Sequence, residues 1–252
     1  IEVPLAVREG RYEFDLDALQ RAFDDGGNLL LLCNPYNPVG RVFSRAELLA
    51  ISEVVERNGG RVFSDEIWAP LVYGGFTHTP YATVSPAAAQ HTITAMSASK
   101  AWNLPGLKCA QLVLTSDADR EVWAEIGPFS GHGTSNLGAI ANTVAYRDGD
   151  PWLADLVPYL EHNRDILLEL LAEEIPDAWM PKPEGTYVGW IDFRATGIGD
   201  RPAEFFTRES SVVLTEGTMC GVAGTGFARL IFATPRPILE QVVRRLGASL
   251  RA

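Results

Sequence analysis

The 252-residue chain has the composition of a folded protein whose partner is a small molecule. Hydrophobic residues make up 46% and charged residues 21%, which is enough apolar mass for one large core or two smaller ones. The formal net charge of −11 offers no basic face to a nucleic-acid backbone or an anionic membrane, so both partners are disfavoured. No apolar run approaches the roughly 18 residues that a membrane-spanning helix needs.

Cysteine usage favours a reducing compartment. The three cysteines, Cys33, Cys109 and Cys220, are widely separated and have no CxxC spacing. They indicate neither a disulfide framework nor a metal site. We therefore expect a cytoplasmic protein without a structural metal.

The first half of the chain alternates strand and helix patterns. A strand, a turn and a helix are expected within residues 1–23. An amphipathic segment at residues 44–60, with Ser44 as its cap and Glu47 at the capping-box position, predicts a helix. Short apolar runs predict strands at residues 28–35, 61–66, 91–97 and 109–116. Strands separated by helices indicate βαβ units, so we predict an α/β fold with a mostly parallel sheet and flanking helices.

The second half of the chain changes to a smaller α+β pattern. Helices are predicted at residues 133–149, about 152–173, 202–210 and from 237 onward, with strands at 186–193, 211–217 and 227–233. We place the domain boundary inside the long helix. The predicted domains are residues 1–150, which form the large domain, and residues 151–252, which form the small C-terminal domain.

Three polar residues follow predicted strands of the large sheet. These are Asn37, Asp65 and Lys100, and ligands of open α/β sheets bind beyond the carboxyl ends of the strands. Taken singly, Asn37 reads as a turn residue, Asp65 as a helix cap and Lys100 as a solvated loop lysine. Together, an amine for a Schiff base, a carboxylate for a pyridine nitrogen and an amide for a phenolic oxygen are what pyridoxal 5′-phosphate (PLP) requires.

Five motifs carry a family resemblance over essentially the whole chain. In chain order they are NPYNPVG (34–40), SDEIWAPLVYGG (64–75), SASKAWNLPGLK (97–108), EGTYVGWIDF (184–193) and GTGFARLIFATPR (224–236). This order resembles the fold-type I PLP-dependent enzymes of the class I/II aminotransferase superfamily. Within it, the sequence is most similar to the MalY/PatB-type branch, the cystathionine β-lyase-like C–S lyases.

The resemblance implies roles for the residues that meet the cofactor ring. Lys100 would be the catalytic residue that binds PLP as a Schiff base and then carries the proton at the substrate Cα. Asp65 would pair with the pyridine nitrogen, and Asn37 would hydrogen-bond the phenolic oxygen and contact the substrate. Trp68 replaces the tyrosine or histidine usual at its position; its indole N–H could donate to the same oxygen, and simple packing is an equal alternative.

Further roles concern the phosphate and the substrate. By resemblance, Ser97 would donate its hydroxyl to the phosphate and Lys108 would supply a positive charge. Arg229 would bind the α-carboxylate of an amino-acid substrate through two hydrogen bonds. Read without the motif, Arg229 is a half-exposed strand residue.

The resemblance also implies elements that these 252 residues do not contain. They are a glycine-containing phosphate turn, an aromatic that stacks on the cofactor, a tyrosine donated to a partner subunit's site, and early strands of the large sheet beside residues 2–7. We therefore expect the family's homodimer. We also expect that the 252 residues alone hold PLP weakly and show no measurable elimination.

Three functional hypotheses remain open from the sequence. The first is PLP-dependent β-elimination from cystathionine or a related cysteine S-conjugate, which gives a thiol, pyruvate and ammonia. The second is an aminotransferase of the same superfamily, which would use the same residues. The third is an inactive truncated fragment or interaction module that keeps the fold without the chemistry.

Overall fold

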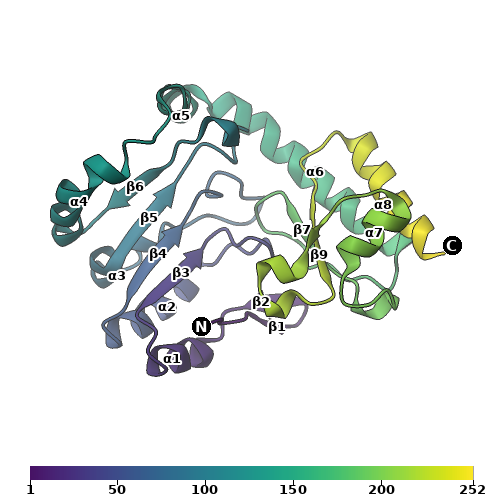
Figure 1. Ribbon diagram of the computed structural model, residues 1–252, viewed down its shortest axis with the longest axis horizontal. Helices are drawn as coiled ribbons and strands as arrows, with labels where there is room; N and C mark the ends of the chain where they lie inside the picture. Colours follow the sequence, from purple (N-terminus) through teal and green to yellow (C-terminus); the bar gives the residue numbers. More distant parts are fainter. Residues whose placement is uncertain (252) are drawn as a thin grey trace.

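The main sheet of the protein, seen in a computed structural model that describes residues 1–251, has four strands. In spatial order they are β3 (Leu29–Cys33), β4 (Arg61–Asp65), β5 (Thr92–Met96) and β6 (Gln111–Leu114) (Figure 1). The first three strands run parallel and β6 runs antiparallel to β5. The predicted α/β fold with a mostly parallel sheet is confirmed.

The helices around this sheet follow from local sequence signals. The helix α2 (Arg45–Arg57) begins with the predicted capping box between Ser44 and Glu47. The apolar face of α2 packs with side chains of β3 and β4 in one buried cluster. The other helices of this half are α1 (Leu16–Asp24), α3 (Pro86–His91), α4 (Asp117–Ser130) and α5 (Asn136–Asp148). Of these, α3 and α4 were not predicted from the sequence.

The N-terminal strand lies outside the main sheet and begins later than the sequence indicated. In the structure β1 (Ala6–Arg8) pairs antiparallel with β2 (Arg11–Glu13). Glu9 and Gly10 between them have φ values of 50° and 75°. Positive φ at both positions is the geometry of a tight hairpin turn, which folds the chain back on itself.

The second half forms a three-stranded antiparallel sheet with helices. Its strands lie in the order β7 (Val188–Asp192), β9 (Phe227–Ile231) and β8 (Thr215–Glu216), and its helices are α6 (Asp150–Glu174), α7 (Pro202–Ser210) and α8 (Arg236–Leu250). Strand β8 is shorter than the predicted 211–217. Ser211 ends α7 with φ of 53°, so the next residues leave the helix before any strand begins.

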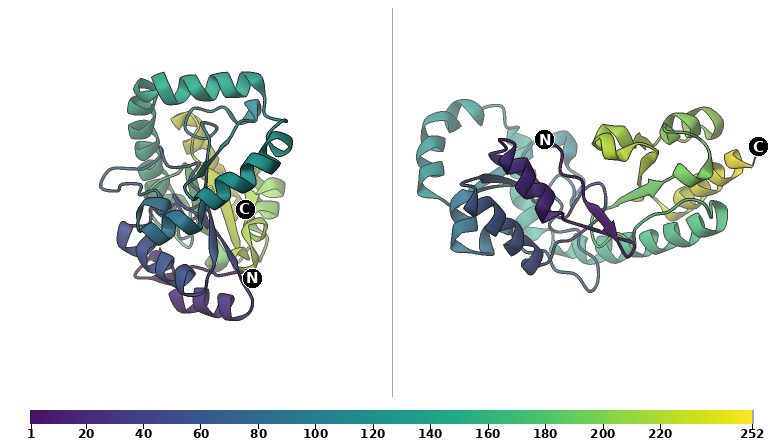
Figure 2. Two further views of the ribbon diagram at one scale, coloured as in Figure 1. Left: turned by 90° about the vertical axis from the view of Figure 1, so that its left-hand side faces the viewer. Right: turned by 90° about the horizontal axis from the view of Figure 1, so that it is seen from below.

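Short 3₁₀ turns complete the described structure. They are η1 (Tyr81–Thr83), η2 (Pro105–Leu107), η3 (Arg194–Thr196), η4 (Gly217–Cys220) and η5 (Val222–Gly224). The long helix α6 runs from the side of α5 to the end of the molecule formed by α7 and α8, where the C-terminus lies (Figures 1 and 2). No helix in the described range has the length and apolar character to cross a membrane.

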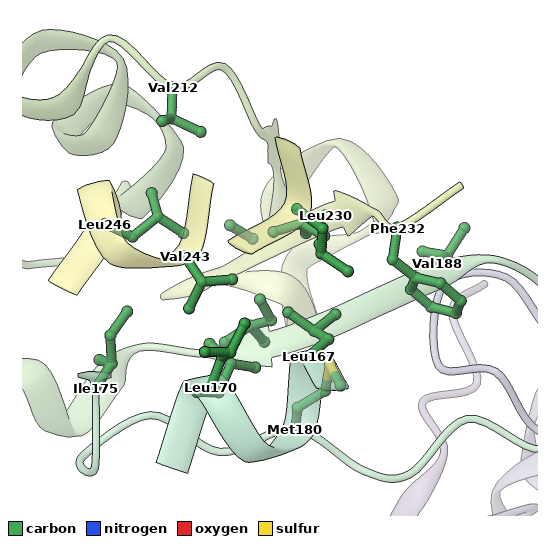
Figure 3. Close-up of a cluster of buried hydrophobic side chains, with 14 of the residues drawn as sticks. Leu167, Leu170, Ile175, Met180, Val188, Val212, Leu230, Phe232, Val243 and Leu246 are labelled. Carbon is green, nitrogen blue, oxygen red and sulfur yellow. The ribbon is translucent and has the colours of Figure 1, made fainter. Parts of the chain in front are cut away.

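The largest buried cluster joins both halves of the chain. Around Leu167 and Leu230 it packs side chains from α6, β7, β9 and α8 (Figure 3). The same cluster includes Trp68, Leu71 and Ala101 from the first half. The division into residues 1–150 and 151–252 stays a prediction, and a continuous core links its two parts.

Candidate active site

The polar residues predicted from the strand ends lie at one edge of the main sheet. Cys33 on β3 is in register with Asp65 on β4, and Asp65 is in register with Ala95 on β5. The three parallel strands therefore end side by side. The segments that carry Asn37 and Lys100 leave the sheet at this same carboxyl edge, as expected of a ligand site in an open α/β sheet.

The small residues around Lys100 are required by close packing. Ala98 and Ala101 are almost completely buried, with exposed fractions of 1% and 0%. The Ala98 N–H donates to Asn142 Oδ1 of α5 at 2.8 Å, and the Trp102 N–H donates to the Ala98 carbonyl at 3.1 Å. Larger side chains would not fit between this turn and its neighbours, so the sequence SASKA holds Lys100 on a rigid base.

The Lys100 amine is close to an aromatic wall and is not neutralised by a carboxylate. Its Nζ lies 5.3 Å from the centre of the Trp68 ring. Trp68 is buried and packs edge-on against Tyr187 with 4.6 Å between ring centres. Within the described part of the chain, Lys100 takes part in no ion pair. Of the two readings of Trp68, the structure shows packing, and its contact with a cofactor oxygen stays a prediction.

Asp65 is a half-buried carboxylate with little compensation from the protein. Burial raises its pKa above the ordinary range, opposed by the Ile67 N–H at 3.1 Å and by the positive charge of Lys100. An ionised carboxylate in this place is costly unless a cationic group faces it. A protonated ring nitrogen is such a group.

Asn37 and Arg229 come from distant parts of the chain and touch. The Arg229 Nη1 donates to Asn37 Oδ1 at 3.2 Å, and its Nη2 donates to Thr215 Oγ1 at 3.3 Å. Arg229 on β9 is in register with Trp190 on β7 and with Thr215 on β8. Among described residues, no partner is present for its buried Nε. The guanidinium is therefore oriented by the protein and keeps bonding capacity for an anion. Sequence reasoning missed Thr215, a polar residue in a run otherwise read as a plain strand.

The Pro–Gly turn brings the chain just after Lys108 back to Ser97. The Ser97 hydroxyl donates to the Cys109 carbonyl at 2.6 Å and accepts from the Ser99 N–H at 3.1 Å. Lys108 follows η2 in the left-handed conformation, with φ of 49°. The backbone of Cys109, the residue after the lysine, thus lies against Ser97, and the hydroxyl proton of Ser97 is committed to that carbonyl.

Burial keeps the thiol of Cys33, at this edge of the sheet, in its protonated form. Burial raises the pKa of the Cys33 thiol to about 12, and the thiol donates to the Pro35 carbonyl at 3.2 Å. Among residues 1–251, no group of three or more His, Cys, Asp or Glu side chains is placed to hold a metal ion. An amine, a carboxylate, an amide and a guanidinium are instead groups that bind an organic cofactor and an amino acid.

The fold and this set of residues define a PLP-dependent transferase scaffold of fold type I. Residues 2–246 match the family model described as aminotransferase class I and II, and the chain belongs to this family.

Named relatives lie in the branch that the motifs indicated. The chain is 38% identical over 248 residues to cystathionine beta-lyase of Corynebacterium glutamicum, which covers 97% of this chain and 66% of the relative. It is 34% identical to cystathionine beta-lyase PatB of Bacillus subtilis, over 98% of this chain and 65% of the relative. The structure of cystalysin from Treponema denticola, which contains PLP, matches with a TM-score of 0.92 and 30% identity, over all of this chain and 64% of that one. The chain spans about two thirds of the length of these relatives.

The residues present fit PLP, the cofactor of this family. The aldehyde would meet the Lys100 amine, which has no carboxylate partner in the described structure. The pyridine nitrogen would face Asp65, whose pKa burial raises and which a cationic partner would stabilise in its ionised form. The phosphate would lie by Lys108 and Ser97, provided that Ser97 releases the Cys109 carbonyl.

Proposed function

We propose that the protein carries out PLP-dependent β-elimination on cystathionine or a related cysteine S-conjugate. The products are a thiol, pyruvate and ammonia. This proposal rests on one observation, that two arrangements of side chains occur together at one site. An uncommitted lysine lies beside a half-buried carboxylate, and an arginine with a free buried N–H lies against Asn37. The names of the relatives favour elimination as the outcome.

The cofactor and the lysine divide the chemistry between them. When bound, PLP supplies an aldehyde that captures the substrate amino group and a ring that accepts the electron pair left at Cα. Lys100 would hold the cofactor by its aldehyde. Its Nζ would also remove the proton at the substrate Cα, and the same amine could then deliver that proton to the departing sulfur.

The other residues bind and orient. Asp65 keeps the proton on the pyridine nitrogen, because a carboxylate with a raised pKa is stabilised by a cationic partner. Arg229 pairs with the substrate α-carboxylate through its spare N–H groups. Asn37 Oδ1 and Thr215 Oγ1 hold the guanidinium plane. Trp68 and Tyr187 form an aromatic wall beside the lysine.

The test is a product assay on the whole PLP-loaded protein with L-cystathionine. We expect homocysteine, pyruvate and ammonia in equal amounts, without any added oxo acid. Turnover that requires an oxo acid and yields a new amino acid would instead establish the aminotransferase alternative, which uses the same residues. The absence of both reactions would support the inactive fragment or interaction module.

We further propose a cytoplasmic homodimer. Family members act on amino-acid substrates and complete their sites across subunits, and the three scattered cysteines suit a reducing compartment. The apolar side chains that α4 and α5 expose are those a second subunit would cover; they include Val122, Ile126, Phe129, Leu137, Ile140 and Val144. Light scattering on the whole protein should give twice the monomer mass, and a monomer at micromolar concentration would contradict this.

A further inference from the structure

Glu184, in the segment before β7, is a buried carboxylate with three donors. It has an exposed fraction of 5%. It accepts from Arg11 Nε at 2.7 Å, from Arg41 Nε at 3.0 Å and from the Val42 N–H at 2.8 Å. All three donors are more than 140 residues away in the sequence. A carboxylate is stable without water only with such compensation, so its bonds fix two distant parts of the chain together.

One of these parts is the loop that presents Asn37. The Tyr36 N–H donates to the Arg41 carbonyl and the Gly40 N–H donates to the Tyr36 carbonyl, both at 2.7 Å, which closes the loop. Arg41 and Val42, where the loop ends, are the residues that Glu184 binds. The loop is therefore fastened at its end by the Glu184 carboxylate.

Backbone hydrogen bonds hold the loop of Asn37 and the segment of Glu184 in direct contact. The Glu184 and Gly185 N–H groups both donate to the Gly40 carbonyl, at 2.8 and 3.1 Å. A Cβ at Gly40 would lie 2.7 Å from Pro183 Cβ, and a Cβ at Gly185 would lie 3.0 Å from Val42 Cγ2. No side chain can fit between the segments, so a shift of one moves the other.

The second part that Glu184 fixes leads directly to Arg229. After Glu184, the Thr186 N–H donates to the Leu71 carbonyl at 2.8 Å and the chain enters β7. On β7, Trp190 is in register with Arg229 of β9. Glu184 thus lies between the loop of Asn37 and the strand pair that carries Arg229.

We propose that Glu184 is a positioning residue that sets the spacing between Asn37 and Arg229. Its carboxylate fastens the loop of Asn37 to the entry of β7, and so determines how the Arg229 guanidinium is presented to a carboxylate. Glu184 acts through these residues and touches neither substrate nor cofactor. Only the kinetic test of this inference rests on the proposed function.

The first experiment replaces the carboxylate by an amide of the same shape. Glu184→Gln in the whole PLP-loaded protein should raise the KM for L-cystathionine about tenfold and change kcat by less than about threefold. The matched control is Asp119→Asn. Asp119 is a similarly buried carboxylate that pairs with Arg61 at the start of β4, the end of the strand away from the candidate site. The control should leave both constants unchanged. A fall in kcat at constant KM in Glu184→Gln would overturn the inference.

The second experiment needs no activity. Amide hydrogen exchange should become faster in residues 36–43 of Glu184→Gln and stay unchanged there in Asp119→Asn. Unchanged exchange in Glu184→Gln overturns the proposed positioning role. If the wild type lacks elimination, the proposed function fails while the exchange result still decides the role of Glu184.

A milder variant keeps the inference testable should Glu184→Gln fold poorly. Arg11 is half-exposed and supplies one of the three donors to Glu184. Arg11→Gln should fold normally, speed exchange in residues 36–43 and raise the KM, each by less than Glu184→Gln. A folded Arg11→Gln with wild-type exchange and KM counts against the inference.

Discussion

The two halves of the candidate site differ in how many hydrogen bonds and charge partners the protein itself supplies to their side chains. On the substrate side, Arg229 is bound by Asn37 and Thr215, and Glu184 fastens the segments behind them. On the cofactor side, Lys100 lies over a ring without a carboxylate partner, and Asp65 has a single backbone N–H.

From this difference we expect the substrate side to orient the substrate and the cofactor side to carry out the reaction. A side chain that hydrogen bonds from the protein already hold has a fixed direction, and any N–H group left over suits the recognition of a rigid group such as a carboxylate. A half-buried charge with little compensation remains costly until another molecule supplies a partner. Substitutions on the cofactor side should therefore remove chemistry, whereas those on the substrate side should weaken binding.

The largest effect is expected at Lys100. Lys100→Ala removes the amine that we propose holds the aldehyde and moves the proton, so activity should fall by about a thousandfold or more. Borohydride should label Lys100 in the wild type and no residue in the variant, as read by peptide mass spectrometry. Lys108→Ala serves as the control and should still be labelled at Lys100. Label on a different lysine would make the assignment wrong.

Asp65 should follow, because under the proposed function its charge would face the ring nitrogen. Asp65→Ala should reduce kcat by about a hundredfold or more, which is roughly 2.7 kcal/mol of barrier, in a protein that still folds. Asp65→Asn keeps the acceptor for the Ile67 N–H and should lose nearly as much. Turnover close to wild type in both variants would reduce Asp65 to a helix cap.

A binding effect is expected on the substrate side. Arg229→Gln removes a charged double hydrogen bond of about 1.5 to 3 kcal/mol, which corresponds to a rise in KM of roughly 10- to 100-fold. The effect on kcat should be smaller. Equal losses in kcat and kcat/KM would show that Arg229 acts in the chemical step and would break the division between the two halves.

The smallest effect is expected away from both halves, at Asp119. Burial alone would raise its pKa, but hydrogen bonds from Arg61 and Ser116 outweigh burial and lower it. The pair therefore stabilises the fold above the ordinary carboxyl range, and this contribution is lost as the pH falls through the lowered pKa. Because Arg61 is 40% exposed, the contribution should stay below about 1 kcal/mol. Asp119→Asn should lose this stability in urea unfolding at pH 7, and its difference from the wild type should shrink as the pH is lowered below the ordinary carboxyl range. A difference that stays the same down the pH series would contradict the ion-pair origin.

Local signals in the sequence predicted much of the fold. The capping box of α2 and the short apolar runs of β3 to β5 are decided by neighbouring residues, so they could be read directly. Helix α4 was missed because Gly127 and Pro128 interrupt its pattern. The strand predicted at 211–217 was overextended because the positive φ of Ser211 depends on how α7 ends.

The site likewise contains features that the neighbouring sequence determines and features that depend on residues far away along the chain. Asn37, Asp65 and Lys100 follow strands, so their gathering at one edge could be predicted from strand order. The contact of Arg229 with Asn37 joins residues 192 positions apart and required the fold. Glu184 reads in the sequence as a loop acid before a glycine, since the donors that bury it lie far away along the chain.

The committed proton of Ser97 has a consequence for how much that hydroxyl can add to cofactor affinity. A serine hydroxyl has one hydrogen to donate, and that of Ser97 points to the Cys109 carbonyl. For Ser97 to donate to a phosphate, it must give up this bond, so the loss of the old hydrogen bond offsets the gain of the new one. In an equilibrium titration with PLP, Ser97→Ala should therefore weaken binding by less than about tenfold.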